Sequence, residues 1–216
     1  AGLHGAALNP LDPDGYSVAA FQLPLIGKAE EGLRIIERAN RLDIPEGFHT
    51  WIRYFCYFHA GRFEEAKPAY TEVEWPGASR LMRSLMGGEA SVGKEMAKSI
   101  SAKWRTARSG PMDWTNRLIF YGPLLVRLGL NEDALWLLER CTEANSPPPY
   151  DFLLVDPDMQ KIKGDRRYSK ALAASRKYAL LFLKQADAAR AQGEYPKQLE
   201  RPLAELRALL EQPPRG

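Results

Sequence analysis

The sequence predicts an all-α fold in which pairs of antiparallel helices stack into an α-α superhelix that ends in C-terminal capping helices. Three observations predict this fold. A motif that begins with glycine recurs at a constant interval, at Gly27 and Gly61 and, after twice that interval, at Gly129. Apolar residues follow each copy at helical intervals of three to four positions. Each copy ends near a proline, a residue that stops helices, at Pro45, Pro76 or Pro147.

The clearest copies of the motif are the first two, Gly27-Lys-Ala-Glu-Glu-Gly32 and Gly61-Arg-Phe-Glu-Glu-Ala66. The copy two intervals further along the chain is Gly129-Leu-Asn-Glu-Asp-Ala134. The same frame predicts a degenerate copy over residues 95 to 107, with Glu95 in place of glycine. A small residue in the preceding helix lets two helices approach closely, and the frame places Ala20, Gly88 and Gly122 at that position, with Tyr54 as the exception.

We therefore expect four helix pairs, each joined by a short turn: 14–26 with 29–42, 48–60 with 63–74, 79–93 with 95–108, and 114–128 with 131–143. One such pair carries too much apolar surface to be stable alone, so neighbouring pairs must stack. Residues 6–13 look like the tail of an earlier repeat whose first helix is missing, which predicts that the chain is a fragment.

Beyond the triple proline at 147–149, Asp156 and Pro157 predict a helix start, Gly164 the end of that short helix, and Asp165 the cap of the next one. A long helix over 168–192 is expected to cover the fourth pair. The last helix carries one apolar stripe. We expect this stripe to fold back onto the long helix, the alternative being a homodimer through the C-terminal helices. Its members are Leu199, Leu203, Leu206 and Leu210.

Composition narrows the functional classes. The 216 residues are 45% hydrophobic and 26% charged, as in a globular chain of one extended domain or two small ones. The longest apolar run, Tyr178 to Leu183, is far shorter than the roughly 20 residues of a membrane span, so no membrane insertion is predicted. Thirty Lys and Arg against 27 Asp and Glu are mixed along the chain, which predicts no direct nucleic-acid contact.

Several local patterns resemble chemical sites without meeting their requirements. Gly88-Glu-Ala-Ser-Val-Gly93-Lys94 has the spacing of a phosphate-binding P-loop, but the segment before it is helical in pattern and Glu95 follows the lysine. The two acidic pairs, Asp12-Pro-Asp14 and Asp156-Pro-Asp158, are explained more simply as helix caps. The histidines and the two cysteines show no recognised ligand or nucleophile spacing, so we predict no metal, cofactor or catalytic residues. They are His4, His49, His59, Cys56 and Cys141.

The motif interval of about 34 residues, the turn glycines and the final prolines resemble the tetratricopeptide repeat over residues 6–148. The resemblance implies a solenoid of about four repeats in residues 1–148, the third degenerate, and capping helices in 149–216. The phrases Leu8-Asn-Pro-Leu-Asp-Pro13, Leu42-Asp43 and Pro45 look like repeats attached to bacterial signalling proteins, among them winged-helix transcription regulators and class III nucleotide cyclases. This likeness implies a non-catalytic regulatory module in the cytoplasm.

In such repeats the first helix of each pair lines a concave groove, where ligands lie. Aromatic residues crowd residues 48–58; Trp51, Phe55 and either Phe58 or His59 share one helical face, while Tyr54 points into the stack. We expect this groove to bind a peptide or protein partner, with a small apolar ligand as the alternative and an enzyme subunit as the least favoured function. The alternative is that the aromatic residues form the core, and for any single one of them this alternative is favoured, because aromatic residues dominate cores as well as interfaces. The predicted groove residues are Phe48, Trp51, Phe55, His59, Leu85, Glu89, Asn116, Ile119, Pro123 and Arg127.

Overall fold

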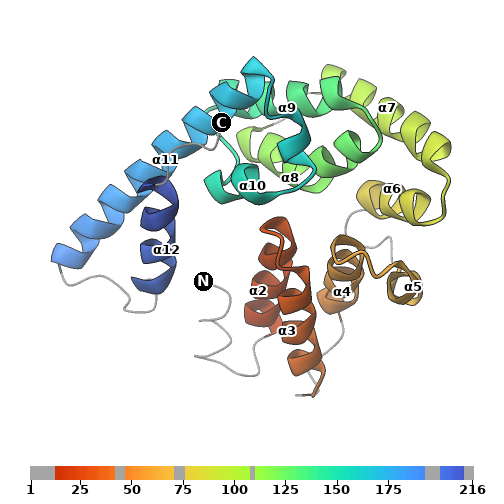
Figure 1. Cartoon of the computed structure of the whole chain (residues 1–216), viewed down its shortest axis with the longest axis horizontal. Coiled ribbons are helices and arrows are strands. Elements are labelled where there is room, and N and C mark those ends of the chain that lie inside the picture. The colour runs from red at the N-terminus through yellow and green to blue at the C-terminus, as the bar shows by residue number, and fades with distance from the viewer. Residues whose placement is uncertain (1–12, 42–46, 71–75, 108–109, 193–199, 212–216) are drawn as a thin grey trace.

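The structure is a computed structural model that describes residues 13–41, 47–70, 76–107, 110–192 and 200–211. Throughout these ranges the regular elements are helices, which confirms the all-α class (Figure 1). None of the described helices has both the length and the apolar character needed to span a bilayer. The expectations about residues 6–12, Leu42, Asp43, Pro45 and Leu199 lie outside the described residues, and so does the side chain of Phe48.

Four helix pairs follow one another along a curved path, so that α2 at its start comes to lie beside α8 (Figure 1). The pairs are α2 (Pro13–Leu25) with α3 (Ala29–Arg41), α4 (Gly47–His59) with α5 (Phe63–Ala66), α6 (Pro76–Met86) with α7 (Ala90–Thr106), and α8 (Pro111–Arg127) with α9 (Asn131–Glu143). A 3-10 turn, η1 (Lys67–Ala69), continues α5. Then follow α10 (Tyr150–Val155), the 3-10 turn η2 (Met159–Ile162), α11 (Arg166–Ala191) and α12 (Glu200–Glu211).

A glycine with positive φ ends the first helix of every pair. These residues have φ values of 70° to 75°, a conformation that glycine adopts without a steric penalty. The third of them is Gly88, which comes seven positions before the place that the frame assigns to a turn, Glu95. The expected third pair, 79–93 with 95–108, is therefore out of register, and Gly88 is a turn residue rather than a helix contact. The four are Gly27, Gly61, Gly88 and Gly129.

Pro68 accounts for the shortened second pair. The predicted helix over 63–74 ends as an α-helix at Ala66 and as a 3-10 turn at Ala69, because proline lacks the amide hydrogen that a helix interior needs. The two helices after the Gly88 turn, α7 and α8, have 17 residues each. Their added length restores the average period by Gly129.

A buried glycine or alanine follows each turn glycine by five positions, at Gly32, Ala66, Gly93 and Ala134. At Gly32 an added Cβ atom would lie 2.9 Å from the Ala20 carbonyl oxygen and 2.9 Å from the Cys56 sulfur. The two helices of the first pair therefore touch through their backbones. Gly93 packs against the side chain of Ser84, whose hydroxyl oxygen would lie 2.6 Å from an added Cβ, so the segment with P-loop spacing is a helix-turn-helix contact.

The C-terminal third forms a second, smaller core. Near its start, α11 packs on α9 and contributes Tyr168 and Ala171 to the main core, as expected for a helix that covers the fourth pair. Further along, Leu183 packs with Leu203 and Leu210 of α12, so the last stripe does fold back onto the long helix. The short helix α10, directly after the three prolines, is an element that the sequence pattern did not predict.

Candidate functional site

The predicted groove residues Trp51 and Phe55 are buried, with exposed fractions of 1% and 2%. Their rings stack at 5.1 Å between centroids, and the Trp51 indole donates to the Ser79 hydroxyl at 3.0 Å. Phe21 of α2 and Phe120 of α8 pack against the Trp51 and Phe55 rings, and the centroids of the Phe21 and Phe120 rings are 5.3 Å apart. The expectation of an open groove at Trp51 and Phe55 is wrong, because aromatic side chains of the first and fourth pairs cover them.

The sequence pattern does not single out Phe21 and Phe120, although a signal for Phe120 exists. It follows Asn116 by four positions and precedes Pro123 by three, so all three share one face of α8. No comparable signal places Phe21 against α8, because that contact depends on how tightly the pairs curl. The inner face of the curved path is thus a filled aromatic cluster, defined here as Phe21, Trp51, Phe55 and Phe120.

A polar cluster borders these rings where α4, α8 and η2 meet. Arg127 donates from Nε to Asp158, and its guanidinium carbon lies 4.8 Å from the centre of the Phe58 ring. Lys161 donates to the other Asp158 oxygen at 2.7 Å. The His59 ring lies 4.3 Å from that of Phe55, and burial lowers the pKa of His59 to about 3, assisted by Arg127 and opposed by Asp158. His59 is therefore uncharged near neutral pH.

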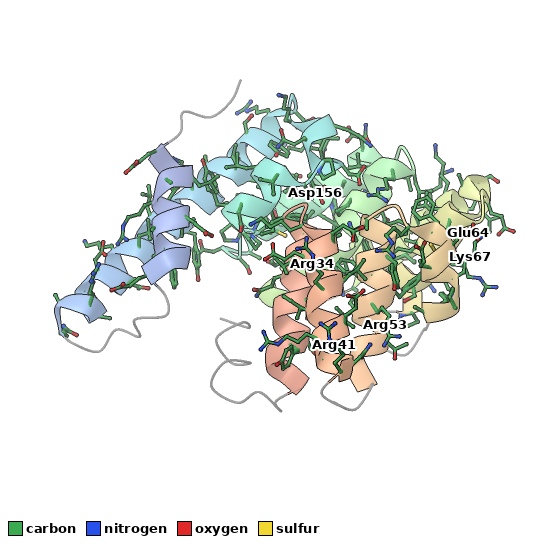
Figure 2. All side chains as sticks on the ribbon, turned by 60° about the horizontal axis from the view of Figure 1, so that its bottom comes forward. Arg34, Arg41, Arg53, Glu64, Lys67 and Asp156 are labelled. Atoms are coloured by element: carbon green, nitrogen blue, oxygen red, sulfur yellow. The ribbon has the colours of Figure 1, made fainter. Side chains whose placement is uncertain are left out.

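Asp156, two residues before Asp158, is buried, with an exposed fraction of 1% (Figure 2). Its carboxylate accepts hydrogen bonds from the backbone N–H groups of Asp158, at 3.0 Å, and Met159, at 2.8 Å. Burial raises the pKa of Asp156 to about 6, against the lowering effect of these hydrogen bonds. Asp156 therefore caps the turn that begins at Asp158, as predicted, whereas the Asp158 side chain makes no capping hydrogen bond and pairs with Arg127 and Lys161.

The remaining predicted groove residues differ in exposure. Pro123 is buried, whereas Asn116, Ile119 and Leu85 are half-buried. Glu89 is exposed at the turn before α7, where its carbonyl oxygen accepts from the Ser84 hydroxyl at 2.6 Å. These positions supply edges of the inner face but no open aromatic groove.

Another surface combines tryptophan and arginine across α7, α8 and α9. Arg117 of α8 lies between two indole rings, with its guanidinium carbon 4.8 Å from Trp114 and 5.6 Å from Trp104. Trp114 meets Trp136 edge to face at 5.5 Å. Two further guanidinium groups flank Trp136, at 4.6 Å and 5.8 Å. We call this surface the tryptophan–arginine array; it comprises Trp104, Arg105, Trp114, Arg117, Trp136 and Arg140.

The arginines of the array are not equally satisfied. Arg105 pairs with Asp133 at 2.7 Å and Arg140 with Glu143 at 2.5 Å. The Nη1 atom of Arg117 and the Nε atom of Arg140 are buried and have no hydrogen-bond acceptor among the described residues. A buried donor without an acceptor is costly. The sequence does carry a signal for this surface, because tryptophan and arginine follow each other at intervals of one, three and four positions on successive helices.

A cavity of about 330 Å³ opens between η1 and α6. Arg83 stacks over the Tyr70 ring, with its guanidinium carbon 4.9 Å from the ring centre. Lys67 lies at the outer edge of the molecule, where it pairs with Glu64 at 2.6 Å (Figure 2). The cavity thus combines positive charge with apolar surface. Its lining residues are Lys67, Tyr70, Arg83, Met86 and Gly87.

The fold and these surfaces define an all-α protein of stacked helix pairs with a filled inner face. Neither the family models nor the curated proteins nor the solved structures contain a match to the chain. Its function is therefore argued from its own residues.

Proposed function

We propose that this protein is a non-catalytic binding module, a helical-repeat scaffold similar to tetratricopeptide-repeat proteins, which holds a peptide or a domain of a partner protein. The observation that carries the proposal is the tryptophan–arginine array. Tryptophan and arginine are among the residues most enriched where binding energy concentrates at protein interfaces. The filled inner face moves the proposed binding surface away from the aromatic groove and onto α7, α8 and α9.

The chemistry of the array suggests what the partner presents. Arg117 is held between Trp104 and Trp114, which fixes the direction of its N–H groups. Its unpaired Nη1 donor requires an oxygen acceptor. A segment with a carboxylate or a main-chain carbonyl at this point, and apolar side chains on the Trp136 ring, would complete the site.

The titration of the buried groups also supports a non-catalytic role. Burial raises the pKa of the Cys56 and Cys141 thiols to about 12, so both remain protonated and poorly nucleophilic. His59 is uncharged near neutral pH and therefore not available as a general acid, and Asp158 is already neutralised by Arg127 and Lys161. These groups serve packing and ion pairing.

Selection from a displayed library of random peptides, followed by calorimetric titration of the selected peptides, tests the proposal. We expect Arg117→Lys and Trp136→Ala to weaken binding by about ten-fold or more, since one bidentate guanidinium contact or one buried indole contributes at least about 1.4 kcal/mol. Arg34→Lys, an exposed arginine on α3 (Figure 2), is the matched control. Selected peptides that bind all these variants equally would place the site elsewhere.

The cavity beside Arg83 favours a second candidate, a small-molecule sensor, because its volume falls within the range of ligand sites. Its cationic and aromatic lining fits a small aromatic carboxylate rather than a purely apolar ligand. Thermal melting with benzoate and with benzylamine separates the two functions. A sensor shows a higher midpoint with benzoate only, and Arg83→Gln removes that rise; a scaffold melts at the same temperature throughout.

A further inference from the structure

An exposed apolar face lies on the outer half of α11, separate from the array and from the cavity. Tyr178, Leu180, Leu181 and Phe182 are 58%, 43%, 51% and 47% exposed. The adjoining face of the same helix packs on α12 through Leu183. In Figure 1, α11 extends beyond the helix pairs, and α12 lies along one side of it. With 3.6 residues per turn, Tyr178, Leu181 and Phe182 share one side of α11, whereas Leu180 lies beyond the lysines on another side. The exposed apolar face therefore consists of Tyr178, Leu181 and Phe182, and large apolar side chains gathered on one exposed face mark an interaction site.

The spacing of this face is that of a coiled-coil seam. Positions 171, 174, 178, 181, 185 and 188 alternate steps of three and four, and they carry Ala, Ala, Tyr, Leu, Gln and Ala. Ala171 is buried in the main core, so the seam runs out of the core and becomes exposed along α11. Its small residues allow a second helix to approach closely, and Tyr178 and Leu181 supply the larger contacts.

One edge of the seam is uniformly basic. Lys170, Lys177 and Lys184 recur at every seventh residue, next to the seam, and all three are exposed. No ion pair involves them within the described parts of the chain, whereas Arg176 and Arg190 of the same helix have partners on α12. Arg176 donates to the Leu210 carbonyl at 3.2 Å, and Arg190 pairs with Glu200 at 3.3 Å. The single acid of α11, Asp187, is bound by Arg207.

This charge pattern disfavours a second copy of the chain as the occupant. An antiparallel pair of α11 helices centred on the exposed seam places Lys177 opposite Lys184, which repels. A parallel pair brings the lysines beside Ser175, Phe182 and Ala189, none of which is acidic. Coiled-coil partners are selected by the charges at these flanking positions, so the complement of three lysines is a helix with acids there.

A lipid surface is also a poorer fit. Binding of an amphipathic helix to a bilayer scales with the apolar area that it buries. Three of the six seam positions are alanine and one is glutamine, so the seam offers little volume to a bilayer. Small seam residues instead favour contact with another helix, whose backbone can approach them.

We propose that the face of α11 between Ala174 and Ala188 docks an acidic amphipathic helix of a partner protein. The partner helix lies against Tyr178, Leu181 and Phe182, next to α12, and directs its Glu or Asp residues toward Lys170, Lys177 and Lys184. This inference does not depend on the tryptophan–arginine array, since neither surface contributes residues to the other.

Two synthetic peptides test the proposal on the full chain. Both have three heptads with Leu at the seam positions; one has Glu and the other Lys at all flanking positions. We expect the Glu peptide to bind at least about ten-fold more tightly than the Lys peptide and its affinity to fall as salt increases, as expected for charge-selected pairing. Fluorescence anisotropy of the labelled peptides measures both affinities.

Variants identify the residues that bind the peptide, and a measurement of helix content checks that each variant folds. The double change Lys177→Glu and Lys184→Glu should reverse the peptide preference, and Leu181→Asp should abolish binding of the Glu peptide. Lys98→Glu, an exposed lysine on α7, should change neither affinity by more than about two-fold, as for a screened remote charge. Circular dichroism should show unchanged helix content in every variant, because all four positions are exposed.

Three results would overturn the proposal. The first is equal binding, or no binding, of the two peptides. The second is a dimer of the unmodified chain in light scattering that Leu181→Asp converts to a monomer, which would assign the face to a second copy. The third is sedimentation with phosphatidylcholine–phosphatidylserine vesicles that Leu181→Asp removes, which would assign it to lipid.

Discussion

The aromatic cluster of the inner face and the exposed face of α11 are built from similar residues, but the first is buried and the second is exposed to solvent. Phe55 is 2% exposed, whereas Phe182 is 47% exposed. Phe55 is covered because α2 and α8 bring Phe21 and Phe120 onto it. Phe182 has α12 on one side of its helix and no covering ring among the described residues. Whether a ring is buried therefore depends on which other helices pack against it, and not on the residue type.

The test with the largest expected effect on stability makes the same substitution in both regions. Phe55→Ala should lower the free energy of unfolding by about 3–5 kcal/mol, because it removes a fully buried ring and leaves a cavity. Phe182→Ala should change it by less than about 0.5 kcal/mol, since the side chain is exposed. Urea unfolding followed by circular dichroism measures both. Similar losses in the two variants would mean that the α11 face is covered.

A second test compares two glycines. Gly32→Ala should cost about 1–3 kcal/mol, because the new Cβ would meet the Ala20 carbonyl oxygen and the Cys56 sulfur at 2.9 Å, in a tightly packed pair. At Gly164 no atom lies within 4 Å of an added Cβ. Gly164→Ala is the control and should be close to neutral. Equal thermal midpoints for the two variants would contradict close packing in the first pair.

The pH dependence of stability tests how well the inner face excludes water. The pKa of His59 is about 3 in the folded chain and about 6.5 when unfolded, so the unfolded state binds the extra proton between these values. The contribution of His59 to the free energy of unfolding is therefore fully present above pH 6.5 and is lost as the pH falls toward 3. Relative to His59→Gln, the unmodified chain should lose about 1–2 kcal/mol between pH 7 and pH 5.

Asp156 acts in the opposite direction, which is why the His59→Gln comparison is needed. Its folded pKa of about 6 exceeds the unfolded value of 3.8, so protonation between these values stabilises the folded chain. Both chains contain Asp156, and its contribution cancels in the difference. A difference that does not change with pH would show that His59 is fully hydrated.

The smallest expected effect concerns the start of α11. Asp165 accepts a hydrogen bond from the Arg167 backbone N–H at 2.7 Å, so Asp165→Ala should lower the free energy of unfolding by removing the cap of α11. Glu132→Gln, which weakens an exposed ion pair with the same Arg167 side chain at 3.0 Å, should have a smaller effect on the free energy of unfolding, because solvent screens exposed ion pairs. Guanidinium unfolding resolves the two. A larger loss at Glu132 would mean that the ion pair, not the cap, fixes the helix start.

The sequence predicts four helix pairs, the turns at Gly27, Gly61 and Gly129, and the Asp165 cap because these depend on neighbouring residues. Each turn glycine lies a few positions from the helices that it joins, and the Asp165 side chain caps its own helix. Pro68 is also a local signal. It ends the second helix of the second pair early, and the third turn therefore comes earlier in the chain, at Gly88. A strictly constant repeat length fails there because α5 is short, whereas the later helices α7 and α8 are long.

The candidate site was less predictable, for a physical reason. Whether Trp51 lines a groove or fills a core depends on Phe120, which lies two helix pairs further along the chain, and on Phe21. Helical periodicity places Trp51 and Phe55 on one face but does not say what faces them. The tryptophan–arginine array could be anticipated from spacing within each helix, yet its assembly required the α7–α8–α9 arrangement.

The contact between Phe21 and Phe120 has a further consequence for how the chain unfolds. An array of repeats whose units touch only their neighbours can fray from either end, one unit at a time. Here Phe21 of the first pair contacts Phe120 of the fourth pair. The first pair therefore cannot unfold separately without also breaking this long-range contact. The four pairs should melt together, and the first of them, despite its place at the end, should exchange its amide hydrogens as slowly as the middle.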